Sequence, residues 1–184
     1  MTNWTRRGFI ATAGASLTSA CAGGTSSNAR FKIDANVDAA LRQMEAEIPF
    51  TTSLVDRAAG MLVMPKITKG SFIFGGAYGE GSLLVGNAPV DYYNTVAGSW
   101  GLQIGGQQIS QVLFFMDENA LQNFRSKSGW TLGADLEYTL IDNADAAGLD
   151  TNTISDGVYS VVFGQAGLLV GVSLEGSKYN RVVR

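Results

Sequence analysis

Apolar side chains recur at helical spacing across residues 34–47 and place one apolar stripe on an amphipathic helix. The repeating residues are Val37, Leu41, Met44 and Ile48. Pro49 ends this helix, because proline cannot continue the helical hydrogen bonding, and residues 51–59 predict a second short helix. We expect both helices to cover a sheet, although an apolar face of this kind can also insert into a membrane.

From Gly60 onward the pattern changes to short apolar runs separated by glycines, which is typical of a curved antiparallel sheet. The runs predict strands over residues 61–64, 71–78, 82–86, 92–96, 101–106, 111–116, 132–141, 158–163 and 168–174. A short helix over 117–124 has Asp117 as its N-cap, and the acidic stretch 142–156 predicts a surface loop. The expected fold is therefore α+β, with a strongly bent, barrel-like antiparallel β-sheet and short N-terminal helices packed on it.

The beginning of the chain has the plan of an export signal. Arg6 and Arg7 precede an uncharged, mildly apolar stretch over residues 9–20, and residues 5–10 resemble the twin-arginine export motif. Small residues then lead directly to Cys21, in an arrangement that resembles the lipobox of bacterial lipoproteins. We predict that Cys21 is acylated; the alternative is that it is an ordinary residue of a cleaved peptide.

These segments give the expected domain organisation. Residues 1–21 form the export signal peptide with its lipobox, and residues 22–30, rich in glycine, serine and threonine, form a flexible tether. Residues 31–184 form one folded domain, in keeping with the usual domain size.

Composition excludes most familiar catalytic designs. The 184 residues include no histidine and one cysteine, which excludes His-ligated metals, Ser-His-Asp triads, intrachain disulfides and multi-thiolate zinc sites. We expect no catalytic residue, no metal and no cofactor. One alternative stays open: Glu80 and Glu175 each border glycines and could form a carboxylate pair of the kind that glycosidases use.

Charge argues against nucleic acid as a partner. The chain has 13 basic and 16 acidic residues, and removal of the signal peptide leaves 11 basic residues, whereas nucleic-acid binding needs clustered positive charge. Glycine-rich segments at 79–81 and 171–178 lack the helix that a phosphate-binding loop requires, so we expect no nucleotide.

Four sequence blocks, in order, resemble the SYLF lipid-binding domain, and the resemblance covers roughly residues 31–184. The blocks are residues 58–70, with its Pro-Lys run; 72–81, with its Gly-Glu-Gly turn; 98–107; and 167–177, with Ser-Leu-Glu-Gly. The resemblance implies a domain that binds phospholipid, phosphoinositides in eukaryotic members, some of which also associate with actin. Bacterial relatives are typically secreted proteins or lipoproteins.

The Pro-Lys block supplies the candidate binding residues. Lys66 and Lys69 are the positions best suited to meet lipid phosphates, because lysine serves as a point charge for phosphate; the alternative is that both are exposed strand-end lysines. We expect the aromatic residues around them to be mostly core, with some at a membrane interface. These residues are Phe72, Phe74, Tyr78, Tyr92, Tyr93 and Trp100.

Together these observations predict a lipid-anchored protein of the bacterial cell envelope, on the periplasmic side of the outer membrane, that binds phospholipids or the membrane surface. The alternative is a structural or interaction module that binds envelope proteins or peptidoglycan. In that case the acyl chains on Cys21 are its whole lipid contact.

Overall fold

The computed structural model describes residues 27–71, 74–100, 105–127, 129–132, 139–141, 157–167 and 176–184. The predicted signal peptide with Cys21, the predicted loop 142–156 and the predicted strand 168–174 lie outside these residues. The described elements are the helices α1 (Ser27–Glu47), α2 (Thr51–Arg57) and α3 (Glu118–Ser126), and the strands β1 (Gly60–Ser71), β2 (Phe74–Val85), β3 (Ala88–Trp100), β4 (Gly105–Phe115), β5 (Gly129–Thr131), β6 (Thr139–Ile141), β7 (Val158–Gly167) and β8 (Lys178–Val182).

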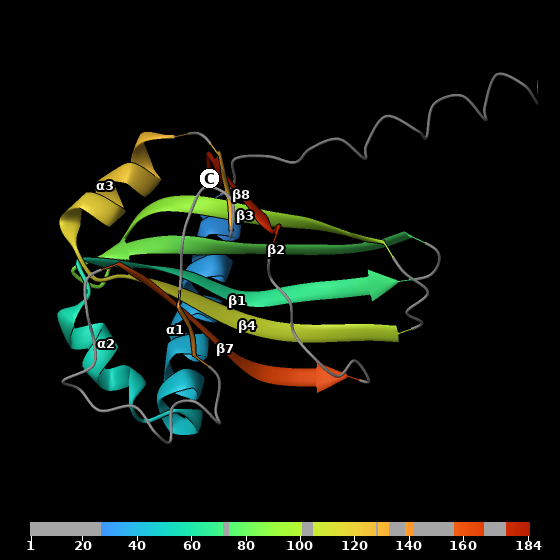
Figure 1. Cartoon of the computed structure of the whole chain (residues 1–184), viewed down its shortest axis with the longest axis horizontal. Coiled ribbons are helices and arrows are strands. Elements are labelled where there is room, and N and C mark those ends of the chain that lie inside the picture. The colour runs from blue at the N-terminus through green and yellow to red at the C-terminus, as the bar shows by residue number, and fades with distance from the viewer. Residues whose placement is uncertain are drawn as a thin grey trace, which may run out of the picture.

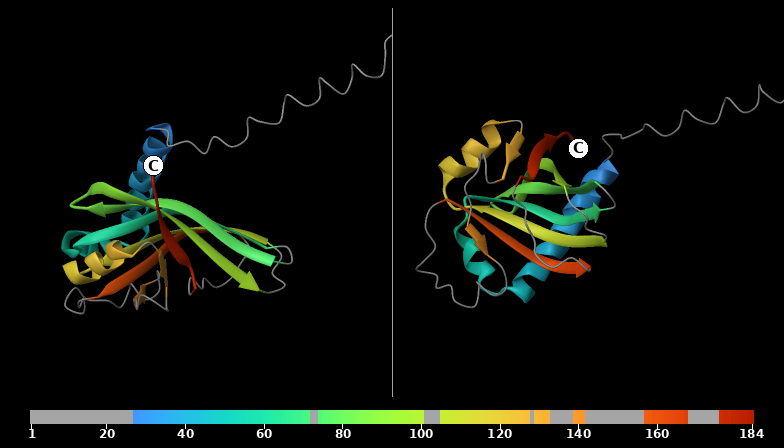
Figure 2. Two further views of the ribbon diagram at one scale, coloured as in Figure 1. Left: turned by 90° about the horizontal axis from the view of Figure 1, so that it is seen from above. Right: turned by 45° about the vertical axis from the view of Figure 1, so that its right-hand side comes forward.

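The described strands form one sheet in the order β5-β8-β3-β2-β1-β4-β7-β6. Seven strands pair antiparallel, and β6 joins β7 in parallel at one edge. Helix α1 crosses one face of the sheet, and α3 lies toward the other side, near the end where β4 finishes (Figures 1 and 2). The predicted α+β class, with a bent antiparallel sheet and N-terminal helices, is confirmed.

Helix α1 is longer than its predicted span, because it begins at Ser27 instead of residue 34. Ile33 is buried four positions before Val37 and extends the apolar stripe toward the N-terminus. The helix therefore includes residues 27–30, the last four of the predicted tether. Helix α3 has its predicted N-cap: the carboxylate of Asp117 accepts a hydrogen bond of 2.8 Å from the backbone N–H of Ala120.

Two cores lie on the two faces of the sheet, because side chains alternate along each strand. Met61 and Val63 of β1 join the core under α1, whereas Leu62 and Met64 join the core on the α3 side. Among the described residues, the buried side chains of both cores all come from Ile33 or later. Residues 22–184 therefore keep every core side chain that the structure describes.

The sheet curls around its α3 side, which becomes the concave face. The hydroxyl of Tyr179 on β8 donates a hydrogen bond of 2.6 Å to Oε1 of Gln111 on β4, although these strands are four places apart in the sheet. The amide of Gln111 then donates to Oγ of Ser160 over 2.9 Å. This buried chain of hydrogen bonds fixes the curvature, since its members meet only when the sheet bends.

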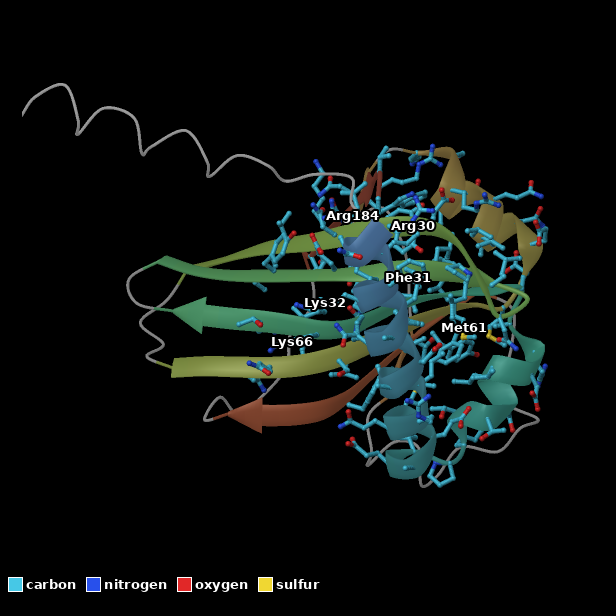
Figure 3. The ribbon with its side chains drawn as sticks, turned by 180° about the vertical axis from the view of Figure 1, so that it is seen from behind. Arg30, Phe31, Lys32, Met61, Lys66 and Arg184 are labelled. Atoms are coloured by element: carbon cyan, nitrogen blue, oxygen red, sulfur yellow. The ribbon has the colours of Figure 1, made fainter. Side chains whose placement is uncertain are left out.

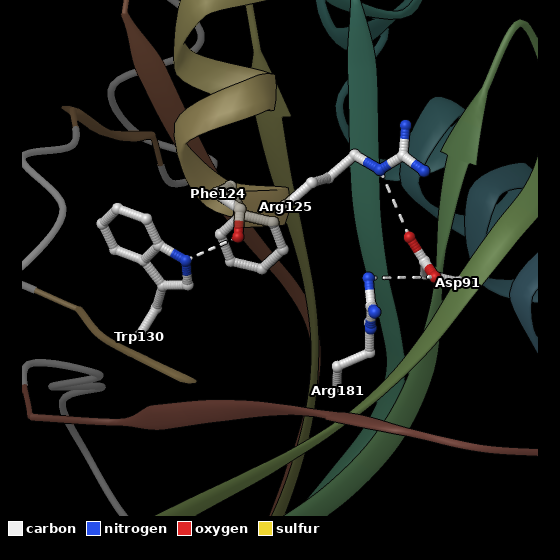
Figure 4. Close-up of polar contacts among 5 residues, drawn as sticks. All are labelled: Asp91, Phe124, Arg125, Trp130 and Arg181. Carbon is white, nitrogen blue, oxygen red and sulfur yellow. Dashed lines mark hydrogen bonds and ion pairs between the residues drawn. The ribbon is translucent and has the colours of Figure 1, made fainter. Parts of the chain in front are cut away.

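Helix α3 is held against the concave side by polar contacts at its C-terminal end (Figure 4). The indole N–H of Trp130 donates to the carbonyl oxygen of Phe124 over 2.6 Å. Asp91 of β3 lies between two arginines. Its Oδ2 is 3.2 Å from Nε of Arg125 on α3, and its Oδ1 is 3.7 Å from Nη1 of Arg181 on β8. Exposed ion pairs of this kind add little stability, so the apolar contacts of α3 contribute most.

Two buried tyrosines on the concave face predict opposite responses to loss of the hydroxyl. Within the described part of the chain the hydroxyl of Tyr93 has no hydrogen-bond partner, whereas that of Tyr179 bonds Gln111. We expect Tyr93→Phe to raise the free energy of unfolding by up to about 1 kcal/mol and Tyr179→Phe to lower it by about 1–3 kcal/mol, measured by chemical denaturation at pH 7. A less stable Tyr93→Phe protein would contradict this account.

Tyr93 also predicts a pH dependence of stability. Burial, reinforced by the charge of Asp91, raises the pKa of Tyr93 from 10.0 to about 12. The folded state therefore favours the neutral phenol, and this stabilisation is present below pH 10 and is lost as pH rises from 10 to about 12. Across that window we expect the wild type to lose stability relative to Tyr93→Phe.

Candidate functional site

The sheet has an outer half that extends beyond α1. Strands β1, β2, β3, β4 and β7 run past the helix on one side, as Figures 1 and 2 show. We call this part the outer sheet; it consists of residues 66–71, 74–80, 94–100, 105–110 and 163–167. Its α1-side face includes the exposed residues Lys66, Thr68, Tyr78, Val96 and Gln108.

Lys66 and Lys69 lie on opposite faces of the outer sheet. Strand β1 pairs with β2 without irregularity from Lys66 to Ser71, so residues three positions apart point to opposite sides. Lys66 is opposite Glu80 on the α1 side, whereas Lys69 is opposite Ala77, which packs against the concave core. The two lysines therefore do not form one headgroup site.

Lys69 has the environment of a partly covered strand residue. Its side chain is partly buried, and burial lowers its pKa below the usual value of 10.5. A lysine that has lost part of its hydration on the concave side is poorly placed to reach a flat membrane surface. Lys66 is the exposed member of the predicted pair.

Glu80, the carboxylate opposite Lys66 on β2, is bound by other groups. Glu80 accepts a hydrogen bond of 2.6 Å from the hydroxyl of Tyr78 and forms an ion pair with Arg184. Arg184 is in turn held through its carbonyl oxygen, which accepts a hydrogen bond from Arg30 of α1. Figure 3 shows Arg30 and Arg184 side by side at the upper end of α1. Because Glu80 is neutralised by Arg184, the charge of Lys66 is left to face solvent.

Sequence patterns did not predict the exposed apolar pair next to Lys66. Tyr78 and Val96 are directly opposite each other on β2 and β3, and their exposed fractions are 50% and 40%. Tyr92 and Tyr93 are buried, as expected for core aromatics. The sequence signal for Tyr78 is its place among the small residues Gly76, Ala77 and Gly79, which leaves few neighbouring side chains to cover it.

The described residues contain no group of acidic or cysteine side chains that could hold a metal ion. Glu80 is ion-paired, and Glu175, its candidate catalytic partner, lies outside the described residues. Among the helices that the structure describes, none is long and apolar enough to cross a membrane.

A family comparison matches the second half of the chain. Residues 96–182 match the Ysc84 family model, described as a Las17-binding protein actin regulator. The Ysc84 match begins at Val96 and ends in β8, so it covers Val96 and Lys178 but neither Lys66 nor Lys69. It supports the SYLF family, and with it a non-catalytic lipid-binding domain. A search of curated proteins finds no match to the chain.

Proposed function

We propose that this chain is an exported, membrane-anchored lipoprotein whose domain binds phospholipid bilayers without catalysing a reaction. The observation that supports it most is the local charge. On their α1-side face the outer sheet and β8 carry two exposed lysines, Lys66 and Lys178, and one carboxylate, Glu80, which is paired with Arg184, in a chain that is acidic overall. Basic residues near an anionic bilayer surface each contribute about 1 kcal/mol to binding.

The proposed anchor is the acylated Cys21, at the end of a twin-arginine signal peptide. Only residues 22–26 separate Cys21 from α1, so the beginning of the helix can be at most about 25 Å from the acylated sulfur. One acyl chain holds a protein marginally, whereas several hold it stably. In this proposal the domain stays beside the bilayer of the bacterial envelope, on the periplasmic side of the outer membrane, and adds its own contact with phospholipid.

Co-sedimentation with vesicles tests the proposal, using residues 22–184, which lack the acyl anchor. We expect retention on vesicles of phosphatidylcholine mixed with phosphatidylglycerol, weaker retention at higher salt, and little on phosphatidylcholine alone. Loss of retention in every mixture would contradict the proposal. That result would favour an interaction module for envelope proteins or peptidoglycan, held at the membrane by Cys21.

A further inference from the structure

We propose that the α1-side face of the outer sheet is the surface that lies on the bilayer, with Tyr78 and Val96 entering the headgroup region. This inference rests on the proposed function and adds which surface of the domain meets the bilayer and how the domain is oriented there. The occupant to which it commits is an anionic phospholipid bilayer. The candidate lysine pair does not supply this surface, because Lys66 and Lys69 point to opposite sides of β1.

The face is built by strand register. Thr68 of β1, Tyr78 of β2, Val96 of β3 and Lys178 of β8 are successive cross-strand partners, so their side chains share one face. All four are exposed. Lys66 stands two positions from Thr68 on the same face. The row therefore combines one aromatic ring, one aliphatic side chain and two lysines on a single exposed surface.

Helix α1 adds a further cation along the edge of this surface. Glu47 and Gln43 mark the edge of α1 that borders the outer sheet, because Glu47 accepts a hydrogen bond of 3.0 Å from the backbone N–H of Gly164 on β7. Lys32 lies on the same edge, three helical turns before Gln43. Figure 3 shows Lys32 and Lys66 on the same side of α1.

Charge complementarity selects an anionic surface as the partner. Among the residues that make up the outer sheet, Glu80 is the only carboxylate, and it forms an ion pair with Arg184. The helices α1 and α2 are nearly balanced in charge, with five acidic residues, Asp34, Asp38, Glu45, Glu47 and Asp56, and four basic ones, Arg30, Lys32, Arg42 and Arg57. The local excess of positive charge is therefore in the exposed row itself, through Lys66 and Lys178, and it favours a negatively charged surface.

The apolar content of the face fits a bilayer better than a protein. A stable protein interface buries about 800 Å² on each partner around a large apolar centre, whereas this face offers one tyrosine and one valine. Tyrosine is enriched where membrane meets water, because its ring is apolar and its hydroxyl is polar. The hydroxyl of Tyr78 already donates to Glu80, so the ring lies across the surface instead of being packed in the core.

Site-specific labelling tests the face. The chain has one cysteine, Cys21, so residues 22–184 are cysteine-free and accept a single polarity-sensitive nitrobenzoxadiazole label at an introduced cysteine. Val96→Cys probes the proposed face. Val90→Cys is its matched control, because Val90 is an equally exposed valine of the same strand, at 41% against 40%, about 20 Å away.

On phosphatidylglycerol-containing vesicles at saturating lipid, we expect the label at position 96 to brighten severalfold and shift to the blue, and the label at position 90 to stay unchanged. A third label, at Phe31→Cys, reports on the exposed side chain near the beginning of α1. Brightening at position 31 or 90 without brightening at 96 would overturn the proposed face, while retention in co-sedimentation would leave membrane binding intact. Absence of retention for the unlabelled protein would overturn both.

A second variant avoids the label. Tyr78→Ser removes the ring and leaves a polar side chain on an exposed position, so we expect the fold to persist, checked by circular dichroism, and the vesicle partition coefficient to fall severalfold. Val90→Ser provides the control and should bind as the wild type does. Equal partition of Tyr78→Ser and wild type would overturn the role of Tyr78.

Discussion

Reversal of both lysines of the exposed row, in a Lys66→Glu, Lys178→Glu protein, is expected to abolish retention of residues 22–184 on phosphatidylglycerol-containing vesicles. Each basic residue near an anionic surface contributes about 1 kcal/mol, and reversal replaces an attraction by a repulsion. The two changes together therefore cost about 4 kcal/mol, which corresponds to a roughly thousandfold lower partition coefficient. Vesicle co-sedimentation at low salt measures this partition coefficient directly.

A charge-matched control separates the face from net charge. Arg125→Glu with Lys127→Glu changes the net charge by the same amount at the end of α3, on the concave side of the sheet and therefore away from the α1-side face. Both residues are exposed and neither is on the outer sheet. We expect this control to keep most of its retention. A loss as large as that of the lysine pair would show that total charge, and not the outer sheet, controls binding.

Substitution of Gly81 by alanine is expected to disrupt the sheet. A Cβ atom at this position would lie 1.9 Å from the carbonyl oxygen of Val63 and 2.7 Å from the sulfur of Met64. Backbone must move to admit it, because the nearest atom belongs to the main chain of β1. We expect Gly81→Ala to lower the free energy of unfolding by about 3 kcal/mol or more, measured by chemical denaturation.

Gly70 is the matched control, since it lies on the neighbouring strand β1 and a Cβ there would meet nothing within 4 Å. We expect Gly70→Ala to leave stability unchanged or to raise it by up to about 1 kcal/mol, because alanine loses less backbone freedom on folding. Equal stability of the two variants would contradict the close approach of β1 to β2.

The close approach of β1 to β2 at Gly81 also determines the strand register at the candidate site. The pairing of β1 with β2 is irregular between Val63 and Lys66, and regular pairing resumes where Lys66 faces Glu80. Gly81 lies directly beside Glu80, so the glycine lets the irregular part of β1 lie against β2. A Gly81→Ala protein that still folds is expected to show a changed register around Lys66.

Several elements could be predicted because their signal is local. The apolar stripe of α1 follows helical periodicity, and Asp117 before a short amphipathic segment indicates the start of α3. Glycine-rich apolar runs predicted the bent antiparallel sheet. The end of the fold was harder: β8 has the sequence KYNRV, whose single buried residue, Tyr179, gives too short a pattern to indicate a strand.

The faces of β1 could not be predicted, because residues 61–64 are apolar on both sides of the sheet and show no alternation. The irregularity after Val63 then shifts which side later residues face. Lys66 and Lys69 looked equivalent because residues 65–70 fall between two predicted strands, whereas in the structure they continue β1 and alternate between its faces. The exposure of Tyr78 and Val96 could not be predicted, since it depends on where α1 ends its cover of the sheet.

The central claim is that the domain binds a phospholipid bilayer without its acyl anchor. Its most direct test is the partition coefficient of residues 22–184 measured against vesicles whose phosphatidylglycerol fraction is raised stepwise from zero. The account predicts a steep rise with anionic lipid that is suppressed by salt. A partition coefficient that stays at zero at every lipid composition would contradict it and leave Cys21 as the protein's whole attachment to the membrane.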